Sequence, residues 1–276
     1  MENLVGTETS IAIRGSSGKL GSLVKQSLEL ASVNSISINR ETKYSQIKNP
    51  MFILDFAGPN PKNEQYWESF CLTKILDEYL EFLDWVKDTQ SFYIRIGSYG
   101  EFSSNLTKYE YVSKEISSVV NKYLTNSAVN GCILYPSNIY GRKSLRNFVE
   151  VAIETYFRTE TLNILNEDKM INPIHFEDLV RFLVDLVRNL QTSHATYSNI
   201  ALISGSLYSV STINEYVANQ VANFDICREL QQEMIDEFSL RDSNPKSIKL
   251  EILPNRLKNY IDTEVKNELE CHSNVL

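Results

Sequence analysis

The sequence predicts an α/β fold, with a doubly wound parallel sheet and a smaller, partly interleaved C-terminal lobe. Three observations support it. Short apolar runs alternate with helical stretches, a glycine-rich turn follows the first run, and the alternation loosens after about residue 145. We therefore expect one domain over residues 1–145, with returning segments near 170–210, and a second lobe over residues 146–276.

Short apolar runs mark the strands of the expected sheet. They cover residues 11–14, 35–38, 51–57, 92–96 and 132–135. Apolar residues at helical spacing predict long helices over about 66–86 and 107–124, and shorter ones near 149–157, 178–190 and 212–221. Because strands alternate with helices, we expect the strands to run parallel, with helices on both faces of the sheet.

Composition narrows the class of protein. The 276 residues carry a formal net charge of -8 without a basic stretch, which argues against nucleic acid as a partner. The polar first residues are not expected to be a secretory signal, and no apolar run is long enough to cross a bilayer. Four scattered cysteines and three histidines predict buried free thiols in a reducing cytoplasm, and no metal site.

A glycine-rich turn follows the first expected strand and opens a helix. Gly15, Gly18 and Gly21 are spaced three residues apart, a pattern that differs from the widely quoted G-x-G-x-x-G. The first glycine permits a sharp turn, the second lets the backbone approach phosphates, and the third lets helix and strand pack closely. The residues predicted to bind a dinucleotide here are Gly15, Ser16, Ser17, Gly18, Lys19, Leu20 and Gly21.

The loop after the second expected strand bears on the choice of cofactor. A cofactor with a free ribose hydroxyl would be recognised there by Asp or Glu, whereas this chain has Asn39 and Arg40. Arg40 could hold a 2′-phosphate through charge-assisted hydrogen bonds, or it could be a solvated surface residue. The loop favours NADP (NADPH), with NAD as the alternative.

Several segments, in order, resemble the extended short-chain dehydrogenase/reductase superfamily, in its NAD(P)-dependent nucleotide-sugar epimerase, dehydratase and reductase branch. The resemblance covers most of the chain up to about residue 220 and implies a Rossmann-type fold. The length of the chain looks most like that of small 4-keto-6-deoxy nucleotide-sugar reductases. The segments are 15–21, 55–59, 96–98, 111–114 and 135–141, with 172–179 and 209–215 in the C-terminal lobe.

The resemblance implies a catalytic set of Ser98, Tyr111 and Lys114. Ser98 would hydrogen-bond the substrate oxygen, and Lys114 would bind the cofactor ribose and lower the pKa of the tyrosine. Free tyrosine titrates near ~10, too high for acid/base work at neutral pH without a nearby cation. The family tyrosine stands four residues before the lysine, where this chain has Glu110. Tyr111 lies about 60° from Lys114 on an ideal helix and Tyr109 about 140°, so Tyr111 is the better surrogate.

The resemblance also implies cofactor contacts from the loops after two further strands. His175 and Asp178 are expected to be a structural histidine–carboxylate pair that tethers the C-terminal lobe. The implied cofactor contacts are Phe56, Ala57, Gly58, Lys114, Tyr135, Pro136, Ser137 and Asn138, with Tyr135 where the family more often has arginine.

Three functions fit these features. The first is an NADPH-dependent reductase of a 4-keto-(6-deoxy) nucleotide sugar in surface polysaccharide biosynthesis, favoured by Arg40. The second is an NAD-dependent nucleotide-sugar epimerase, and the third is an NAD(P)-binding protein impaired in catalysis. Glu101 stands alone after Ser98, which disfavours dehydration, and the displaced tyrosine favours the third function while Ser98 and Lys114 oppose it.

We also expect a homodimer and no membrane partner. The long helix over about 66–86 carries apolar residues beyond a single stripe, which fits a second buried face, as in a four-helix bundle between two subunits. The residues in question are Leu72, Ile75, Tyr79 and Phe82. Packing within one subunit is the alternative.

Overall fold

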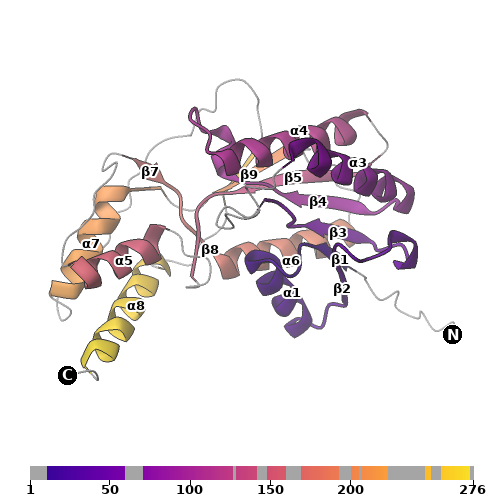
Figure 1. The fold of residues 1–276 in the computed structure, drawn as a ribbon. Coiled ribbons are helices and arrows are strands. Elements are labelled where there is room, and N and C mark those ends of the chain that lie inside the picture. Colours follow the sequence, from indigo (N-terminus) through magenta and orange to yellow (C-terminus); the bar gives the residue numbers. More distant parts are fainter. Residues whose placement is uncertain are drawn as a thin grey trace, which may run out of the picture. The chain divides into compact units, whose positions relative to one another are not determined.

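The computed structural model describes residues 11–59, 71–126, 129–141, 148–159, 169–192, 200–204, 207–222, 246–249 and 256–273. The chain forms two compact units. The first contains Met1–Tyr135 and Leu183–Leu202, and the second contains Pro136–Phe182 and Ile203–Leu276. In Figure 1 the first unit is a sheet with α3 and α4 on one face and α1 on the other.

A parallel sheet forms the centre of the first unit. Its five parallel strands lie in the order β5-β4-β3-β1-β2, and β9 (Ile200–Ser204) lies next to β5. The chain therefore reverses its direction of strand addition at β1, between β2 and β3. The strands are β1 (Ile11–Arg14), β2 (Ser35–Ile38), β3 (Phe52–Asp55), β4 (Phe92–Ile96) and β5 (Gly131–Pro136). This confirms the predicted fold class.

The strands are buried on both faces because the helices that connect parallel strands cover both sides of the sheet. Their side chains in β1, β3 and β4 are almost all buried and apolar, as in sheets covered by helices on two sides. The covering helices are α1 (Lys19–Leu30), α3 (Leu72–Thr89) and α4 (Lys108–Asn126), with short 3-10 turns η1 (Tyr44–Gln46) and η2 (Tyr99–Phe102). The predicted start of α3 at about residue 66 lies outside the described residues.

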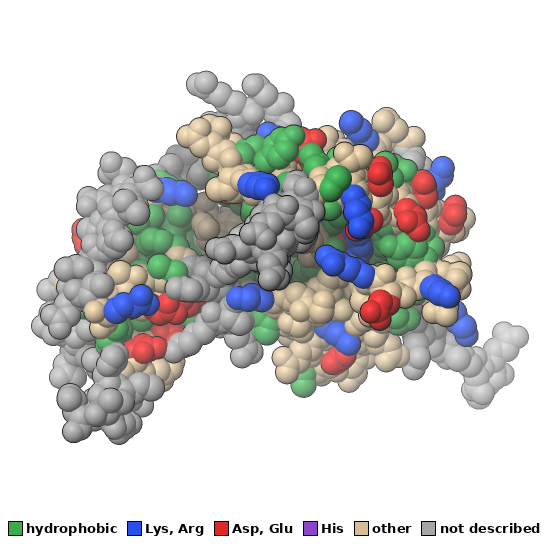
Figure 2. Space-filling model, in the orientation of Figure 1, with side chains coloured by type: hydrophobic (Ala, Val, Ile, Leu, Met, Phe, Trp, Pro, Cys, Tyr) green, Lys and Arg blue, Asp and Glu red, His purple; other side chains and the backbone are tan. Residues whose placement is uncertain are grey.

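The outer face of α3 is acidic. Tyr79 and Phe82, assigned above to a second buried face, are buried in the core of the first unit itself. Figure 2 shows acidic side chains gathered over α3. The exposed residues of α3 include five carboxylates, beside Lys74, Lys87 and Leu80: Asp77, Glu78, Glu81, Asp84 and Asp88. The homodimer stays a prediction, and light scattering checks it.

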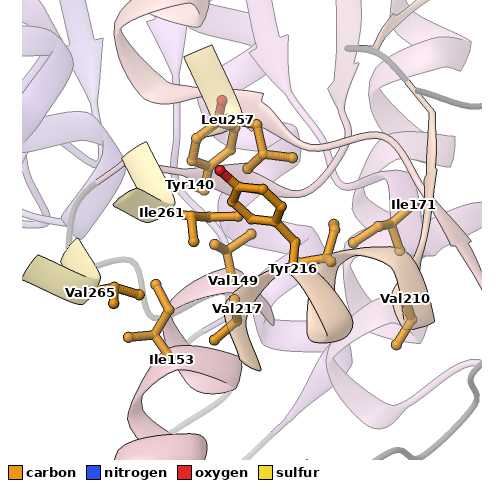
Figure 3. Close-up of a cluster of buried hydrophobic side chains, with 11 residues drawn as sticks. Tyr140, Val149, Ile153, Ile171, Val210, Tyr216, Val217, Leu257, Ile261 and Val265 are labelled. Atoms are coloured by element: carbon orange, nitrogen blue, oxygen red, sulfur yellow. The ribbon is translucent and has the colours of Figure 1, made fainter. Parts of the chain in front are cut away.

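The second unit is built around a separate apolar core. Its helices are α5 (Phe148–Thr159), α7 (Val210–Ala222), α8 (Arg256–Ser273) and the start of α6 (Phe176–Thr192). Strands β6 (Ile139–Tyr140) and β8 (Ile174–His175) pair in parallel, and β7 (Met170–Ile171) pairs antiparallel with β10 (Tyr208–Ser209). The last strand is β11 (Lys246–Lys249). Figure 3 shows the core, in which Val149, Ile153, Val217, Ile261 and Val265 meet.

Sequence patterns located α5, α6 and α7 but missed α8. Among the residues of α8 whose burial is described, Leu257, Ile261 and Val265 form the buried stripe, and charged residues surround them. Such a narrow stripe is a weak signal in the sequence.

Ion pairs connect the start of α8 to the start of α6. The Arg256 Nη2 donates to Glu177 Oε2 at 2.9 Å, and its Nε lies 3.0 Å from Asp178 Oδ2. The Asp178 carboxylate is buried and also contacts Arg181. His175 Nδ1 accepts a hydrogen bond from the Glu177 nitrogen at 3.3 Å and lies 3.9 Å from Glu177 Oε2. The expected pairing of His175 with Asp178 stays a prediction.

Arg256→Ala is expected to destabilise the second unit by about 2–3 kcal/mol, because it removes a charged partner from a buried carboxylate. Urea denaturation measures the change. The comparison variant is Lys258→Ala, which removes an ion pair to Asp262 and a contact with Tyr216 and should cost less than Arg256→Ala, because Asp262 is more exposed than Asp178. Equal losses in the two variants would contradict the role assigned to Arg256.

Two further expectations concern the membrane and the cysteines. Within the described part of the chain, none of the helices combines the length and apolar character needed to cross a bilayer. Cys132 is buried in β5, and burial raises the pKa of its thiol to about 12. Cys71 was expected to be buried but is exposed, because it precedes α3 and lies outside the buried stripe of that helix.

Candidate functional site

The glycine turn lies where β1 and β3 end side by side. Gly15 has a φ of +78°, and a Cβ there would lie 2.7 Å from the backbone nitrogen of Ala57. The Gly15 carbonyl accepts a hydrogen bond from the Gly18 nitrogen at 3.0 Å. A Cβ on Gly21 would lie 2.3 Å from that same carbonyl oxygen. The fold itself therefore requires glycine at both ends of the turn.

The middle of the turn is open and suits an anion. Gly18 is the N-cap of α1, with no side-chain cap and no acidic residue in the first turn of the helix. Ser17, Gly18 and Lys19 are exposed, and within the described part of the chain a Cβ on Gly18 would meet only the Gly15 carbonyl oxygen, at 3.2 Å. The amide groups and dipole at a helix N-terminus attract phosphate, and Lys19 adds a positive charge. Ser16 and Leu20, also predicted here, are half-buried.

The loop after β2 presents hydrogen-bond donors. The Asn39 Oδ1 accepts from the Glu41 nitrogen at 3.0 Å and from Thr42 Oγ1 at 2.8 Å. Its acceptor oxygen is thus engaged within the loop, whereas the amide NH₂ group is a donor. Arg40 is exposed and offers further donors and a positive charge.

Hydrogen bonds from buried side chains hold the backbone of the loop after β3 in place. The Ala57 nitrogen donates to Asp55 Oδ1 at 2.9 Å, and the Ala57 carbonyl accepts from Tyr79 and from Arg95 Nη1, the latter at 3.3 Å. Gly58 is exposed, and no atom of the described residues lies within 4 Å of the position of a Cβ. Phe56 is half-buried, and the carbonyl carbon of Phe56 would lie 2.8 Å from a Cβ on Gly15. The structure thus brings the two predicted cofactor loops, after β1 and after β3, into contact.

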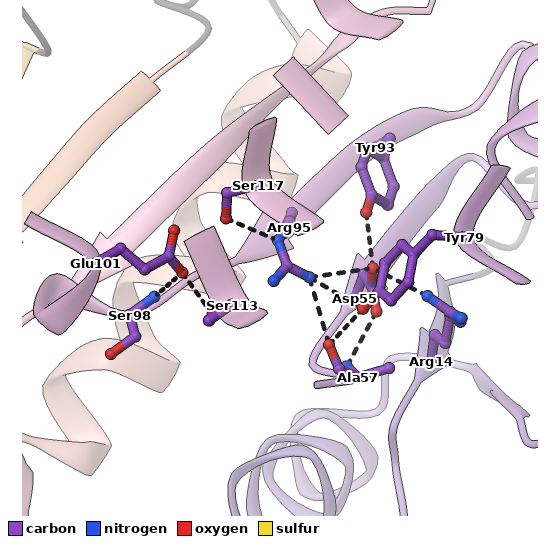
Figure 4. Close-up of polar contacts among 10 residues, drawn as sticks. All are labelled: Arg14, Asp55, Ala57, Tyr79, Tyr93, Arg95, Ser98, Glu101, Ser113 and Ser117. Atoms are coloured by element: carbon purple, nitrogen blue, oxygen red, sulfur yellow. Dashed lines mark hydrogen bonds and ion pairs between the residues drawn. The ribbon is translucent and has the colours of Figure 1, made fainter. Parts of the chain in front are cut away.

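A buried charge network lies beneath this loop. Asp55 is fully buried, and its Oδ2 accepts from the Tyr93 hydroxyl at 2.7 Å and lies 3.4 Å from Arg14 and 3.7 Å from Arg95. Burial, and then the charge of Asp55, raises the pKa of Tyr93, so Tyr93 remains a donor. Figure 4 shows the Asp55–Arg95 network, defined as Arg14, Asp55, Tyr79, Tyr93 and Arg95. The sequence analysis did not predict this network. Its signal in the sequence is a charged residue within or at the end of an otherwise apolar strand, at Arg14, Asp55 and Arg95.

Ser98 is held by a buried carboxylate. It is the N-cap of η2, and its nitrogen donates to Glu101 Oε1 at 2.9 Å. The same oxygen accepts from the Ser113 hydroxyl of α4, as Figure 4 shows. The Ser98 hydroxyl accepts from the Gly100 nitrogen at 3.3 Å. Glu101 is 3% exposed, so it fixes Ser98 from inside the protein.

The inner face of α4 carries Tyr109, Ser113 and Ser117. Tyr109 is hydrogen-bonded to Ser98, and burial raises the pKa of its phenol. Tyr111, by contrast, is 46% exposed, and Lys114 is exposed as well. The structure therefore brings Tyr109 to Ser98, whereas the catalytic role of Tyr111 and Lys114 stays a prediction.

Glu110 caps α4. Its Oε2 accepts from the Thr107 nitrogen at 2.7 Å and from Thr107 Oγ1 at 2.8 Å, and the Glu110 nitrogen donates back to Thr107 Oγ1. This reciprocal pair is a capping box. It gives a structural reason for glutamate at the position where the resemblance implied tyrosine.

The fourth predicted cofactor segment is mostly buried. Tyr135 is hydrogen-bonded to Ser117, and burial raises the pKa of Tyr135 to about 12. Ser137 donates to the Asn172 carbonyl, and the Asn138 carbonyl accepts from the Ile174 nitrogen at 2.8 Å. Pro136 is also buried, and Asn138 is exposed. Cofactor contacts from these residues stay a prediction.

Comparison with known proteins bears on the fold. No family model matches the chain, and no curated protein matches it by sequence. Solved structures do match. UDP-glucose 4-epimerase from Thermotoga maritima, determined with UDP-glucose, is 13% identical, with a TM-score of 0.61 over 95% of this chain and 99% of that chain. The chain has the fold of these proteins.

Two further structures share this fold. UDP-glucuronic acid 4-epimerase from Bacillus cereus, in complex with NAD, is 14% identical, with a TM-score of 0.62 over 77% of this chain and 83% of that chain. A GDP-L-fucose synthetase from Naegleria fowleri bound to NADP is 11% identical, with a TM-score of 0.58 over 96% and 94%. The fold that the resemblance implied is confirmed.

Proposed function

We propose that this protein binds a nicotinamide dinucleotide at the Gly15–Gly21 turn and acts on a nucleotide sugar. The observation that carries the proposal is the open, uncapped start of α1 at Gly18, placed at the ends of β1 and β3 where the strand order reverses. Ligands of open parallel sheets bind at such a point. Structures of the same fold were determined with NAD, with NADP and with UDP-glucose, which supports this ligand class.

The donors after β2 favour NADPH over NADH. A free 2′-hydroxyl is recognised best by an acceptor, and the Asn39 oxygen is already engaged by Glu41 and Thr42. A 2′-phosphate needs donors and positive charge, which Arg40 and the Asn39 amide offer.

Reduction of a 4-keto-(6-deoxy) nucleotide sugar is the reaction that we propose. The reduced cofactor supplies a hydride to the keto carbon when bound. Tyr109 donates the proton to the carbonyl oxygen, and Ser98 orients that oxygen through its hydroxyl. Glu101 keeps the Ser98 backbone in place. We assign the proton to Tyr109 instead of Tyr111 because Tyr109 is the tyrosine bonded to Ser98.

A second candidate function is dinucleotide binding without turnover. The residue four positions after Tyr109 is Ser113, and Lys114 lies on another face of α4. Burial raises the pKa of Tyr109, which makes it a weaker acid. Both observations favour impaired catalysis.

Calorimetry with NADPH and NADH tests the binding step. We expect NADPH to bind at least about tenfold more tightly, a difference of ~1.4 kcal/mol. Loss of the reduced-nicotinamide absorbance with 4-keto-6-deoxy nucleotide sugars then tests turnover. Binding without turnover would favour the second candidate, and no affinity for either dinucleotide would overturn both.

Tyr109→Phe is expected to lower kcat by about 10²–10⁴-fold, because it removes the proton donor and leaves the ring in place. Steady-state kinetics measures the loss, and calorimetry should show unchanged affinity for the dinucleotide. The matched control is Tyr111→Phe, whose side chain is half exposed and which should stay within a few fold of the unaltered protein. A large loss of kcat in Tyr111→Phe with little change in Tyr109→Phe would indicate that Tyr111 is the proton donor.

A further inference from the structure

Tyr79 of α3 contacts both the loop after β3 and the end of β1, just before the glycine turn. Its side chain is buried, at 3% exposed. The hydroxyl donates to the carbonyl of Ala57, in the loop after β3. The ring centre lies 4.1 Å from the guanidinium of Arg14, the residue that precedes Gly15. One core side chain thus joins the two segments, as Figure 4 shows.

Arg95 fixes the direction of the hydrogen bond from Tyr79. Its Nη1 lies 3.0 Å from the Tyr79 hydroxyl oxygen and 3.3 Å from the Ala57 carbonyl oxygen, and a guanidinium only donates. The hydroxyl therefore accepts from Arg95, and its own proton is left for the Ala57 carbonyl. Tyr79, Arg95 and Ala57 form a closed ring of three hydrogen bonds, in which the carbonyl accepts two.

Side chains of the core thus engage both backbone polar groups of Ala57. Its nitrogen donates to Asp55 Oδ1 at 2.9 Å, and both lone pairs of its carbonyl oxygen are used. A Cβ on Gly15 would lie 2.7 Å from that nitrogen, so the Ala57 backbone lies directly against the glycine turn. Ala57 therefore sets the position of the loop against the turn instead of binding a ligand through its own polar groups.

We propose that Tyr79 is a positioning residue for the dinucleotide: its hydroxyl holds the Ala57 carbonyl and keeps the loop after β3 against the Gly15–Gly21 turn. The inference rests on the proposed function. A loop that is already held in its binding position costs less to order when the ligand binds, which increases affinity. Because Tyr79 acts on the loop after β3 and not on the Arg40 loop after β2, it should affect NADPH and NADH alike.

Tyr93 provides a matched control, because it is a second buried tyrosine of the Asp55–Arg95 network. Its hydroxyl donates to Asp55 Oδ2 at 2.7 Å instead of to the Ala57 carbonyl. Tyr79→Phe and Tyr93→Phe each remove one buried hydroxyl group and keep the ring, so urea denaturation should show comparable losses of stability. A difference between the two variants in dinucleotide binding then comes from the contact with Ala57.

The first measurement is made without a dinucleotide and follows the Ala57 carbonyl itself. The sequence contains a single Ala–Gly pair, Ala57–Gly58, so alanine labelled with ¹³C at the carbonyl and glycine labelled with ¹⁵N isolate this carbonyl in the NMR spectrum. A carbonyl carbon that loses a hydrogen bond becomes more shielded. Tyr79→Phe should therefore move the signal upfield, and Tyr93→Phe should leave it in place. Arg95→Met removes the other donor and should also move it upfield, which keeps the test available should Tyr79→Phe fail to fold.

Calorimetry then measures the affinity for NADPH and for NADH. We expect Tyr79→Phe to weaken both about fivefold, the size of one hydrogen bond's contribution, and Tyr93→Phe to stay within about twofold of the unaltered protein. An Ala57 signal that does not move in Tyr79→Phe, or equal losses of affinity in the two variants, would overturn the inference. A signal that moves while affinity stays unchanged would overturn it too. An unaltered protein that binds neither dinucleotide would overturn the proposed function, whatever the Ala57 signal shows.

Discussion

Asp55→Ala is expected to lower the free energy of unfolding of the first unit by about 3–5 kcal/mol, the range for breaking a buried ion pair. The variant leaves Arg14 and Arg95 facing each other without the carboxylate between them. It also removes the acceptor for the Tyr93 hydroxyl and for the Ala57 nitrogen. Because Ala57 begins the loop after β3, dinucleotide affinity should fall together with stability.

Urea denaturation, read by circular dichroism, measures this loss. Asp84→Ala is the control, since Asp84 is an exposed carboxylate of α3 that accepts one hydrogen bond, from Tyr123 at 2.8 Å. That variant should change stability by less than about 1 kcal/mol. An Asp55→Ala protein as stable as the control would show that the two arginines do not depend on Asp55.

The double variant Asp55→Ala with Arg95→Met shows how much of the lost stability comes from the unpaired charge of Arg95 and how much from lost packing. Removing a cation together with its carboxylate leaves less uncompensated charge than removing the carboxylate alone. The double variant should therefore be less destabilised than the sum of the two single variants, by about 1 kcal/mol or more. Additive losses would mean that Arg95 and Asp55 contribute independently.

The sheet could be predicted because its strands carry their own signal. The run Phe52–Asp55 is apolar up to its last residue, and the glycine spacing after Arg14 is fixed by close backbone approach at Gly15 and Gly21. Such features are local. They do not depend on which distant residues pack against them.

The tyrosine that contacts Ser98 could not be predicted in the same way. Angles on an ideal helix, measured from Lys114, favoured Tyr111 over Tyr109. The side chain that reaches Ser98 depends instead on where α4 begins and on which of its faces packs against η2. The signal that was missed is Thr107-x-x-Glu110, a capping-box pattern that places the start of α4 at Lys108 and makes Glu110 structural.

Arg95 and Asp55 also escaped prediction, for a different reason. A single charged residue in or at the end of an apolar strand does not by itself show which residue it pairs with. Only the register of β3 on β4, which sets Asp55 opposite Arg95, shows that the two belong to one network.

Gly21→Ala and Gly18→Ala are expected to have different effects. Gly21→Ala should lower the stability of the protein, and Gly18→Ala should lower its affinity for the dinucleotide. A Cβ on Gly21 would lie 2.3 Å from the Gly15 carbonyl oxygen, a backbone atom that cannot move without disturbing β1. We expect Gly21→Ala to lower the free energy of unfolding by about 3 kcal/mol. Chemical denaturation measures that loss.

Gly18→Ala should fold almost normally. Gly18 has a φ of -72°, which any residue adopts, and its Cβ would lie 3.2 Å from one carbonyl oxygen. The added methyl group would stand over the start of α1, where the backbone is proposed to approach the phosphates. Affinity for NADPH should therefore fall about tenfold or more, while stability changes by about 1 kcal/mol or less. A Gly18→Ala protein that binds NADPH unchanged would show that the phosphates lie elsewhere, and a stable Gly21→Ala protein would show that α1 can shift away from β1.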